Sequence, residues 1–440
     1  MEKILENKKT IVYILVVAFI LRIIWIFAIK TQPISDFKLM YETGRAVANG
    51  NFSGFHGNSY FARFPHDSIT VLYFASLFKI SSTPLILIKI LNCIYETISV
   101  YLIYRIGIKI SNYKLGNIIA ALLCIFPPFI FYTSETMAEN MAIPLFLGSV
   151  LLFLGFINNK KIKPLIYSGI LLSLGDLFRP VGIVFLIAYI IYYILDLIIY
   201  KKEKIKKSIV KIITLIIVFI LPTVVVSNLL VYNKILQNQI WKPLEPTIIT
   251  ILVGTNYNTI GAWNAPDASL AENNNYNKEA ISKIVKKEMT ERFEEHTPVD
   301  ILEFYAKKLV LQWGFGDFGA CGWTINYNKW MQGSTQITNT KNIIDEGISI
   351  FENNIVASLL MIVSWIYYFI LLFFSVKGIM ALKRKFNLAI VFFIILLLGF
   401  IGFYLLTERQ SRYAFIIAWD FVILAGYGML DKINNKKYSH

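Results

Sequence analysis

The segment IVYILVVAFILRIIWIFA, residues 11–28, is long enough to cross the roughly 30 Å hydrocarbon core of a bilayer. A polar stretch, TQPISDFKLMYETGRAVANGNFSGFHGNSYFARFPH at residues 31–66, follows it almost directly. The basic residues MEKILENKKT precede the apolar run, and no small-residue cleavage site follows it. This order predicts an uncleaved first membrane helix, with a polar loop that leaves the membrane beside it.

The composition extends this pattern to the whole chain. The 440 residues are 56% hydrophobic and only 16% charged, whereas a soluble domain carries roughly 25% charged residues. The run at 68–80 is too short to cross a membrane and predicts a re-entrant or interfacial helix. We expect an all-α polytopic membrane protein with about ten spans, near residues 11–28, 84–106, 115–132, 137–157, 164–179, 180–199, 208–230, 353–376, 388–406 and 412–430.

The basic residues predict how the chain is oriented. Lysine and arginine concentrate in the alternate loops that lie on the same side as the N-terminus, whereas the short loops at 132–136 and 177–180 hold only Arg179. Cytosolic loops of membrane proteins carry this excess of cations. We therefore expect a multi-pass protein of the plasma membrane with both termini in the cytosol. The formal net charge of +15 then reflects topology, and no nucleic-acid partner is expected.

Three parts follow from the spacing of the apolar runs. Residues 1–230 form an N-terminal membrane module of about seven spans, which includes the first outer loop, 30–67. Residues 231–352 are too long for a simple connector and predict a small extracytoplasmic domain. Within it, Thr297-Pro298 marks the start of a helix. Residues 353–440 form a C-terminal module of about three spans with a cytosolic tail.

Polar residues that could carry chemistry collect on the predicted outer side. Arginine forks bind phosphate oxygens bidentately, and a carboxylate can take a proton from a hydroxyl group. A cluster of both kinds at one membrane interface therefore suits a reaction on a membrane-anchored anion. The residues are Asp36, Lys38, Arg45, Arg63, Glu135, Glu139, Asp176, Arg179, Glu408, Arg409 and Arg412.

Several of these residues also have structural interpretations. Asp36 precedes the helical pattern FKLMYETGRAVANG and could simply cap that helix. The sequence from Thr136 to Glu139 fits a capping box for the fourth span. Arg409 and Arg412 could contact only lipid headgroups. The spacing alone leaves these alternatives open.

Two further pairs are predicted from position. Asp176 and Arg179 stand three residues apart and could form an ion pair with each other. Arg22 and Glu96 lie inside the first and second spans, where ionisable groups are costly. Because these spans are neighbours in the sequence, we favour a structural Arg22–Glu96 pair over a proton path.

A set of motifs follows one order along most of the chain. They are Asp36 with Tyr41, Ala46, Ala48 and Gly50, then Phe64-Pro65, LLCIFPPFIFYTSETMAENMAIPLFL (122–147), SGILLSLGDLFRPVGIVFL (168–186), VGTNYNTIGAWN (253–264) and TERQSRYAF (407–415). Together these motifs resemble the GT-C superfamily of glycosyltransferases that use polyprenyl-phosphate sugars. The resemblance is to the branch of protein O-mannosyltransferases and aminoarabinose transferases, glycosyltransferase family 39 and its bacterial relatives.

The resemblance implies a GT-C-type bundle and an inverting transfer of sugar from a polyprenyl-phosphate carrier to an envelope polymer, lipid or protein hydroxyl. Asp36 would be the general base, with Glu139 as a second catalytic residue that orients sugar or acceptor. A phosphate leaving group is stable as an anion, so the second acid that glycosidases need is not required. No metal or cofactor is implied. Binding of the donor phosphate would fall to Lys38, Arg45, Arg63, Arg179, Arg409, Arg412 and Tyr413.

Two other functions compete with this interpretation. A transporter or flippase of lipid-linked sugars would predict repeated halves, broken helices and polar groups at mid-membrane, whereas here polar residues concentrate at the outer rim. A non-catalytic envelope-assembly protein could keep the fold without the activity.

Overall fold

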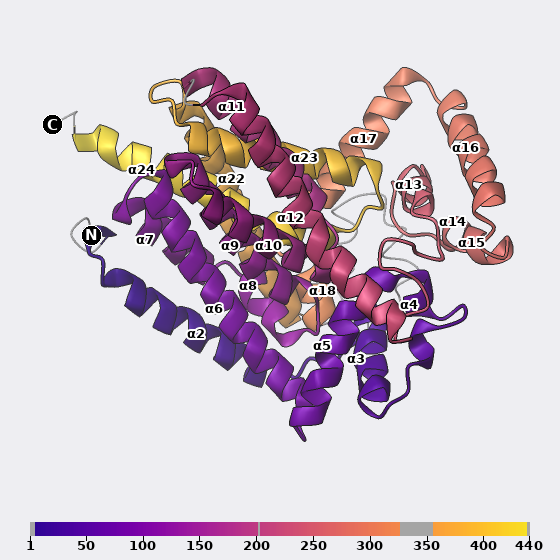
Figure 1. The fold of residues 1–440 in the computed structure, drawn as a ribbon. Helices are drawn as coiled ribbons and strands as arrows, with labels where there is room; N and C mark the ends of the chain where they lie inside the picture. The colour runs from indigo at the N-terminus through magenta and orange to yellow at the C-terminus, as the bar shows by residue number, and fades with distance from the viewer. Residues whose placement is uncertain (1–4, 201–202, 326–354, 438–440) are drawn as a thin grey trace.

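The computed structural model describes residues 5–200, 203–325 and 355–437, and within them all regular structure is helical (Figure 1). Seven helices are long and apolar enough to cross a membrane, so the chain is a multi-pass membrane protein as predicted. They are α2 (Thr10–Ala28), α6 (Pro84–Ile110), α9 (Glu139–Asn159), α11 (Gly182–Tyr200), α12 (Ile205–Tyr232), α22 (Ile355–Ala381) and α23 (Leu388–Leu406).

Two predicted spans are bent rather than straight. α7 (Tyr113–Cys124) ends before Pro127-Pro128, and α8 (Pro128–Phe131) with η3 (Tyr132–Ser134) continues at an angle of 67°. Proline has no amide hydrogen to donate and clashes with the preceding turn, so a helix breaks there. η4 (Ser411–Ile417) and α24 (Trp419–Lys437) form a second bent pair, with an angle of 55°. Counting each bent pair as one span gives nine among the described residues.

The remaining predicted span, 164–179, corresponds to α10 (Ile162–Phe178), which has 17 residues. This length is at the lower limit for crossing a bilayer. α10 ends before Arg179-Pro180, at the boundary between the predicted spans 164–179 and 180–199, and α11 begins at Gly182.

The first loop is folded into helices at one end of the bundle (Figure 1). α3 (Ser35–Ala48) packs on α5 (Ser68–Ile80) so closely that a Cβ atom on Gly44 would lie 2.9 Å from the Cβ of Phe74. Between them lie η1 (Ser53–Phe55), α4 (Tyr60–Arg63) and η2 (Pro65–Asp67). α5 spans only about 20 Å at 1.5 Å per residue, as predicted for a helix that does not cross.

Residues 231–325 add six more helices (Figure 1). The predicted start at Thr297 is confirmed, because its side chain and that of Asp300 form a reciprocal capping box with Pro298 at the first helical position. Residues 326–352 of the predicted extracytoplasmic domain lie outside the described residues. The six helices are α13 (Ile248–Gly254), α14 (Ala265–Ala268), α15 (Leu270–Asn273), α16 (Lys278–Glu294), α17 (Pro298–Trp313) and α18 (Ala320–Thr324).

Close backbone packing holds the C-terminal helices together. A Cβ atom on Gly378 of α22 would lie 2.2 Å from the carbonyl oxygen of Leu424 in α24, and one on Gly428 would lie 2.2 Å from that of Phe374. Small residues let membrane helices approach in this way, since lipid offers no hydrophobic driving force for their association.

The predicted Arg22–Glu96 ion pair is not formed directly. Arg22 donates to the backbone carbonyls of Ala18 (2.9 Å) and Cys124 (3.3 Å). The Glu96 carboxyl is fully buried without a hydrogen-bond partner in the described part of the chain. Because α7 ends at Cys124, the carbonyl of Cys124 has no partner within the helix, and Arg22 donates a hydrogen bond to it instead.

Candidate active site

Asp36 lies in the first turn of α3, partly exposed to solvent. The interpretation of Asp36 as a helix cap is wrong, because the N-cap position is Ile34. Burial raises the pKa of the Asp36 carboxyl, the charge of Asp67 acts in the same direction, and Arg412 and a hydrogen bond from Tyr60 oppose the rise. The Asp36 side chain therefore faces a group of charged and polar residues from distant segments.

Arg412 is the cation that acts most strongly on Asp36. It is buried in η4, and its Cζ atom lies 4.6 Å from the ring centroid of Phe37 and 4.8 Å from that of Trp323. Its Nε donates to Gln410 Oε1 at 3.0 Å. Within the described ranges no carboxylate lies within ion-pairing distance of Arg412. Aromatic faces and an amide hold the guanidinium in place, and its charge stays available.

Arg179 is a second cation of the same group. α10 stops before Pro180, and this break directs Arg179 toward Glu139, with 3.3 Å between Nε and Oε1. Its Cζ atom also lies 4.8 Å from the ring centroid of Tyr413. The alternative pairing with Asp176 is wrong, because Asp176 Oδ1 accepts the backbone N–H of Gly182 (2.7 Å) at the start of α11.

Glu139 is the first residue of α9 and is almost completely buried. The predicted capping box is wrong, since Ala138 occupies the N-cap and Thr136 lies outside the helix. Thr136 instead donates its backbone N–H to the Glu135 carboxylate at 2.8 Å. The helix start therefore leaves Glu139 free to pair with Arg179.

Tyr413 and Glu408 connect the two arginines. The Tyr413 ring lies between them, 5.3 Å from Cζ of Arg412 and 4.8 Å from that of Arg179. Its hydroxyl donates to Glu408 Oε1 at 3.4 Å. Burial raises the pKa of Glu408 to about 7, and Asp36 contributes to the rise, while Arg412 and Arg179 lower it. Glu408 thus changes its charge near neutral pH.

The structure brings five of the nine predicted site residues into one group, which we call the Asp36 cluster. Glu408 was among the predicted polar residues but had no assigned role, and Tyr60, Asp67 and Trp323 were not predicted. Tyr60 and Asp67 lie in the first loop, and Trp323 lies almost three hundred residues later in a glycine-rich stretch, so no local spacing links them to Asp36. The cluster consists of Asp36, Tyr60, Asp67, Glu139, Arg179, Trp323, Glu408, Arg412 and Tyr413.

The other four predicted residues point elsewhere. Lys38 is exposed on α3. Arg45 pairs with Glu42 at 3.0 Å. Arg63 binds Glu245 through Nε (2.9 Å) and through a second guanidinium nitrogen (2.6 Å), which fastens the first loop to residues near 245.

Arg409 is tied to the backbone of residues 259–261. Its Nε donates to the carbonyl of Ile260 at 2.9 Å, another guanidinium nitrogen donates to that of Thr259 at 3.2 Å, and its own N–H donates to Gly261 at 2.7 Å. These bonds hold the segment that carries Arg412, rather than turning the Arg409 charge toward Asp36.

Two side chains of α17 hold the same segment. Lys308 Nζ is buried and donates to the carbonyls of Gly254 (2.6 Å), Leu405 (2.8 Å) and Thr407 (2.8 Å). Gln312 donates to the Gln410 carbonyl at 2.8 Å and accepts its N–H at 3.0 Å. These hydrogen bonds fix residues 405–410 against α17, and Arg412 follows two residues later in the chain. We call this set of contacts the backbone clamp.

Across the described residues, no three histidine, cysteine, aspartate or glutamate side chains are arranged to hold a metal ion. The three cysteines are buried and unpaired. The Asp36 cluster itself offers carboxyl, guanidinium and phenol groups at one end of the helical bundle.

Comparisons with known proteins agree with this architecture. A family model described as dolichyl-phosphate-mannose-protein mannosyltransferase matches residues 67–227. A crystal structure of the Archaeoglobus fulgidus oligosaccharyltransferase in the apo form aligns with a TM-score of 0.56 at 12% identity, covering 96% of this chain and 50% of that one. No curated protein sequence matches the chain.

A second structure of an oligosaccharyltransferase, the archaeal AglB from Archaeoglobus fulgidus in complex with an inhibitory peptide and a dolichol-phosphate, aligns with a TM-score of 0.53 at 10% identity. It is matched over 97% of this chain and 51% of that one. The present chain therefore spans about half the length of the solved structures it matches.

Proposed function

Starting from the GT-C fold of this chain, we propose that it is an inverting glycosyltransferase that moves a sugar from a polyprenyl-phosphate carrier to a hydroxyl group of an envelope polymer, lipid or protein. One observation carries the proposal. A partly exposed carboxyl group, Asp36, lies within the electrostatic reach of Arg412 and Arg179, two arginines drawn from distant parts of the chain. Asp36 can accept the proton of the acceptor hydroxyl, and the two arginines can bind the phosphate leaving group.

Asp36 acts as the general base. It takes the proton of the acceptor hydroxyl, the hydroxyl oxygen attacks the anomeric carbon, and the bond between that carbon and the phosphate oxygen breaks on the opposite face. Burial raises the pKa of Asp36, which makes its carboxylate a stronger base closer to neutral pH. Tyr60 hydrogen-bonds to the carboxylate and orients it.

Arg412 and Arg179 stabilise the departing phosphate. The electron pair of the broken bond stays on the polyprenyl phosphate, whose negative charge grows as the sugar leaves. Fixed cations aimed at developing charge are worth most where water is excluded, and the Arg412 side chain is buried. Glu139 positions Arg179 through their ion pair, and Tyr413 separates the two guanidinium groups.

The donor class is supported by the comparisons. The family model names a mannosyltransferase that uses a dolichyl phosphate, and the solved oligosaccharyltransferase holds a dolichol-phosphate. A lipid-linked donor also suits a site at the end of membrane-spanning helices. With the cytosolic loops assigned by their excess of cations, both termini lie on the cytosolic side of the plasma membrane. The Asp36 cluster then lies on its outer side.

The test is transfer of label in membranes that contain the full chain. Wild type, Asp36→Asn and Asp300→Asn are incubated with radiolabelled polyprenyl-phosphate sugars, and label is followed into polymer, protein and lipid. We expect Asp36→Asn to lose roughly 10²–10⁴-fold in rate, the contribution of a general base. Asp300→Asn is the matched control, because Asp300 only caps α17.

Each outcome decides between the competing functions. Transfer by wild type and by the control, but not by Asp36→Asn, supports the reaction and identifies donor and acceptor. Full activity of a folded Asp36→Asn protein would overturn the role of Asp36. If no donor gives transfer with folded wild type, while labelled lipid crosses reconstituted vesicles, the chain is a flippase instead.

A further inference from the structure

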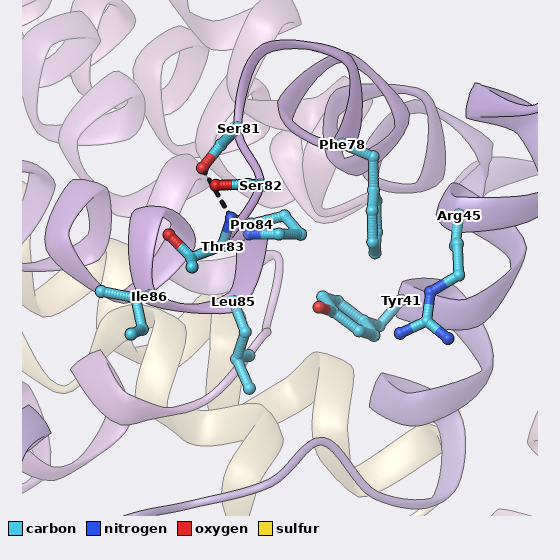
Figure 2. Close-up of a pocket in the computed structure, with 9 residues that line it drawn as sticks. All are labelled: Tyr41, Arg45, Phe78, Ser81, Ser82, Thr83, Pro84, Leu85 and Ile86. Atoms are coloured by element: carbon cyan, nitrogen blue, oxygen red, sulfur yellow. Dashed lines mark hydrogen bonds between the residues drawn. The ribbon is translucent and has the colours of Figure 1, made fainter.

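A cavity of about 470 Å³ lies between α3, α5 and the start of α6 (Figure 2). One wall is formed by Tyr41 and Arg45 of α3 with Phe78 of α5, and the other by residues 81–86, where α5 turns into α6. The cavity is open to the surroundings of the protein, and none of its lining residues belongs to the Asp36 cluster.

Helix geometry separates this cavity from the proposed reaction. Arg45 follows Asp36 by nine residues on α3, and at 3.6 residues per turn these positions lie roughly half a turn apart around the helix axis. Asp36 interacts with Arg412, whereas Arg45 lies against Tyr41 and Phe78. The two faces of α3 thus present a carboxyl group on one side and a cation on the other.

The Arg45 guanidinium is held in a defined place beside the cavity. Its Cζ atom lies 5.7 Å from the ring centroid of Tyr41 and 5.5 Å from that of Phe78, and the two rings are 4.8 Å apart. The ion pair with Glu42 is exposed on both sides, at 52% and 43%. Such surface pairs contribute little, so Arg45 can exchange Glu42 for another anion.

The opposite wall combines hydroxyl groups with apolar side chains. Ser81, Ser82 and Thr83 line the cavity, and Ser81 Oγ accepts the backbone N–H of Thr83 at 3.1 Å (Figure 2). The membrane span α6 begins at the next residue, Pro84. Two large apolar side chains beside these hydroxyl groups are exposed, Ile80 at 73% and Ile86 at 46%. This mixture is typical of the boundary between lipid headgroups and acyl chains.

We propose that this cavity binds the phosphate headgroup of an anionic glycerophospholipid. The Arg45 guanidinium contacts the phosphate oxygens, since its planar fork matches phosphate geometry. The hydroxyl groups of Ser82 and Thr83 donate to the remaining oxygens, and the acyl chains extend along Ile80 and Ile86. The bound lipid would fix the first-loop helices α3 and α5 against the membrane surface. This site is independent of the proposed transfer reaction.

The experiment uses the full chain in phosphatidylcholine nanodiscs that contain a trace of photoactivatable phosphatidylglycerol. Trypsin cuts after Lys79 and Lys89, so the peptide of residues 80–89 reports labelling of the hydroxyl wall. We expect the wild-type label to concentrate there and to be displaced by unlabelled phosphatidylglycerol. Arg45→Gln should lower the label in this peptide roughly fivefold, the effect of one arginine near a charged membrane surface.

Arg105→Gln is the matched control. Arg105 is also an exposed arginine stacked on a tyrosine, Tyr101, but it lies toward the opposite end of α6. This variant changes the net charge equally and should leave the label in peptide 80–89 unchanged. Thermal unfolding of each variant checks that the fold is kept.

Three results would overturn the proposal. Equal labelling by a phosphatidylcholine probe would show no preference for an anionic headgroup. An unchanged label in a folded Arg45→Gln protein would remove Arg45 from the site. Displacement by inorganic phosphate as effective as that by phosphatidylglycerol would assign the cavity to a soluble anion instead.

Discussion

Arg409 and Arg412 are three residues apart and equally buried, at 7% and 6% exposure, yet they lie in two different regions. Arg409 belongs to the backbone clamp and donates to the carbonyls of Thr259 and Ile260. Arg412 belongs to the Asp36 cluster, where Phe37 and Trp323 hold its guanidinium by their ring faces. Burial alone therefore does not distinguish the two arginines, whereas the type of partner does.

The difference has a physical reason. A guanidinium whose N–H groups donate to backbone carbonyls has used its donors to fix the chain, and a substrate would have to displace those carbonyls. A guanidinium packed against aromatic rings keeps N–H donors for a ligand, since contacts with the rings do not use up its hydrogen bonds to acceptors. The clamp thus provides rigidity, and the cluster provides available charge.

Replacing Arg412 should give the largest effect of this comparison. Arg412→Lys keeps the positive charge but loses the planar group that lies against the rings of Phe37 and Trp323. We expect the transfer rate to fall roughly 10²–10³-fold, the usual effect of removing one group that stabilises a transition state. The measurement is the initial rate with the donor that the transfer assay identifies, at saturating donor. An unfolding temperature near that of wild type, together with the lost rate, would separate a chemical role from a structural one.

The matched change in the clamp should affect stability instead. Arg409→Gln leaves the buried carbonyls of Thr259 and Ile260 without their donors. Buried acceptors that lose a partner cost about 1–3 kcal/mol, so the unfolding temperature should fall while the rate per folded molecule changes less than for Arg412→Lys. If Arg409→Gln abolished transfer at unchanged stability, Arg409 would belong with the phosphate-binding residues that the sequence suggested, and the division into clamp and cluster would be wrong.

Local patterns predicted the parts of this fold that depend on neighbouring residues. The apolar runs, the helix start at Thr297 and the break at Arg179-Pro180 each follow from a few adjacent side chains, and the structure has them. The Pro127-Pro128 pair was also visible in the sequence, but the apolar run around it predicted a continuous span, and the structure bends there by 67°.

The membership of the cluster could be predicted only in part. Asp36, Arg179 and Arg412 were selected as charged groups at one membrane interface, and the structure groups them together. Helical phase could have separated Arg45 from Asp36, because nine residues amount to a half-turn difference. Trp323 could not have been found, since its contact with Arg412 depends on how α18 packs against α8 and η3.

The smallest effect concerns the pH dependence of the cluster, through Glu408. Burial raises the pKa of Glu408 to about 7, so it is neutral in weak acid and becomes a carboxylate above neutrality. That carboxylate would compete with phosphate for Arg412. Asp36 must be ionised to act as a base, and burial raises its pKa too. We therefore expect a bell-shaped rate profile, with an acid limb from Asp36 and an alkaline limb near pH 7 from Glu408.

Glu408→Gln tests this assignment because it removes the titration but keeps the size of the side chain. The variant should lose the alkaline limb. One pH unit above the pKa of Glu408, its transfer rate should therefore be about tenfold higher than that of wild type, relative to the maximum of each profile. The free energy of unfolding should also depend on the ionisation of Glu408. The folded state holds the Glu408 proton up to about pH 7, but the unfolded chain releases it near an ordinary pKa of about 4.3. Ionisation thus opposes folding as the pH rises through this interval, and Glu408→Gln should raise the unfolding temperature most at alkaline pH. An unaltered alkaline limb in the variant would assign that limb to another group, and Arg412 would then act without competition from Glu408.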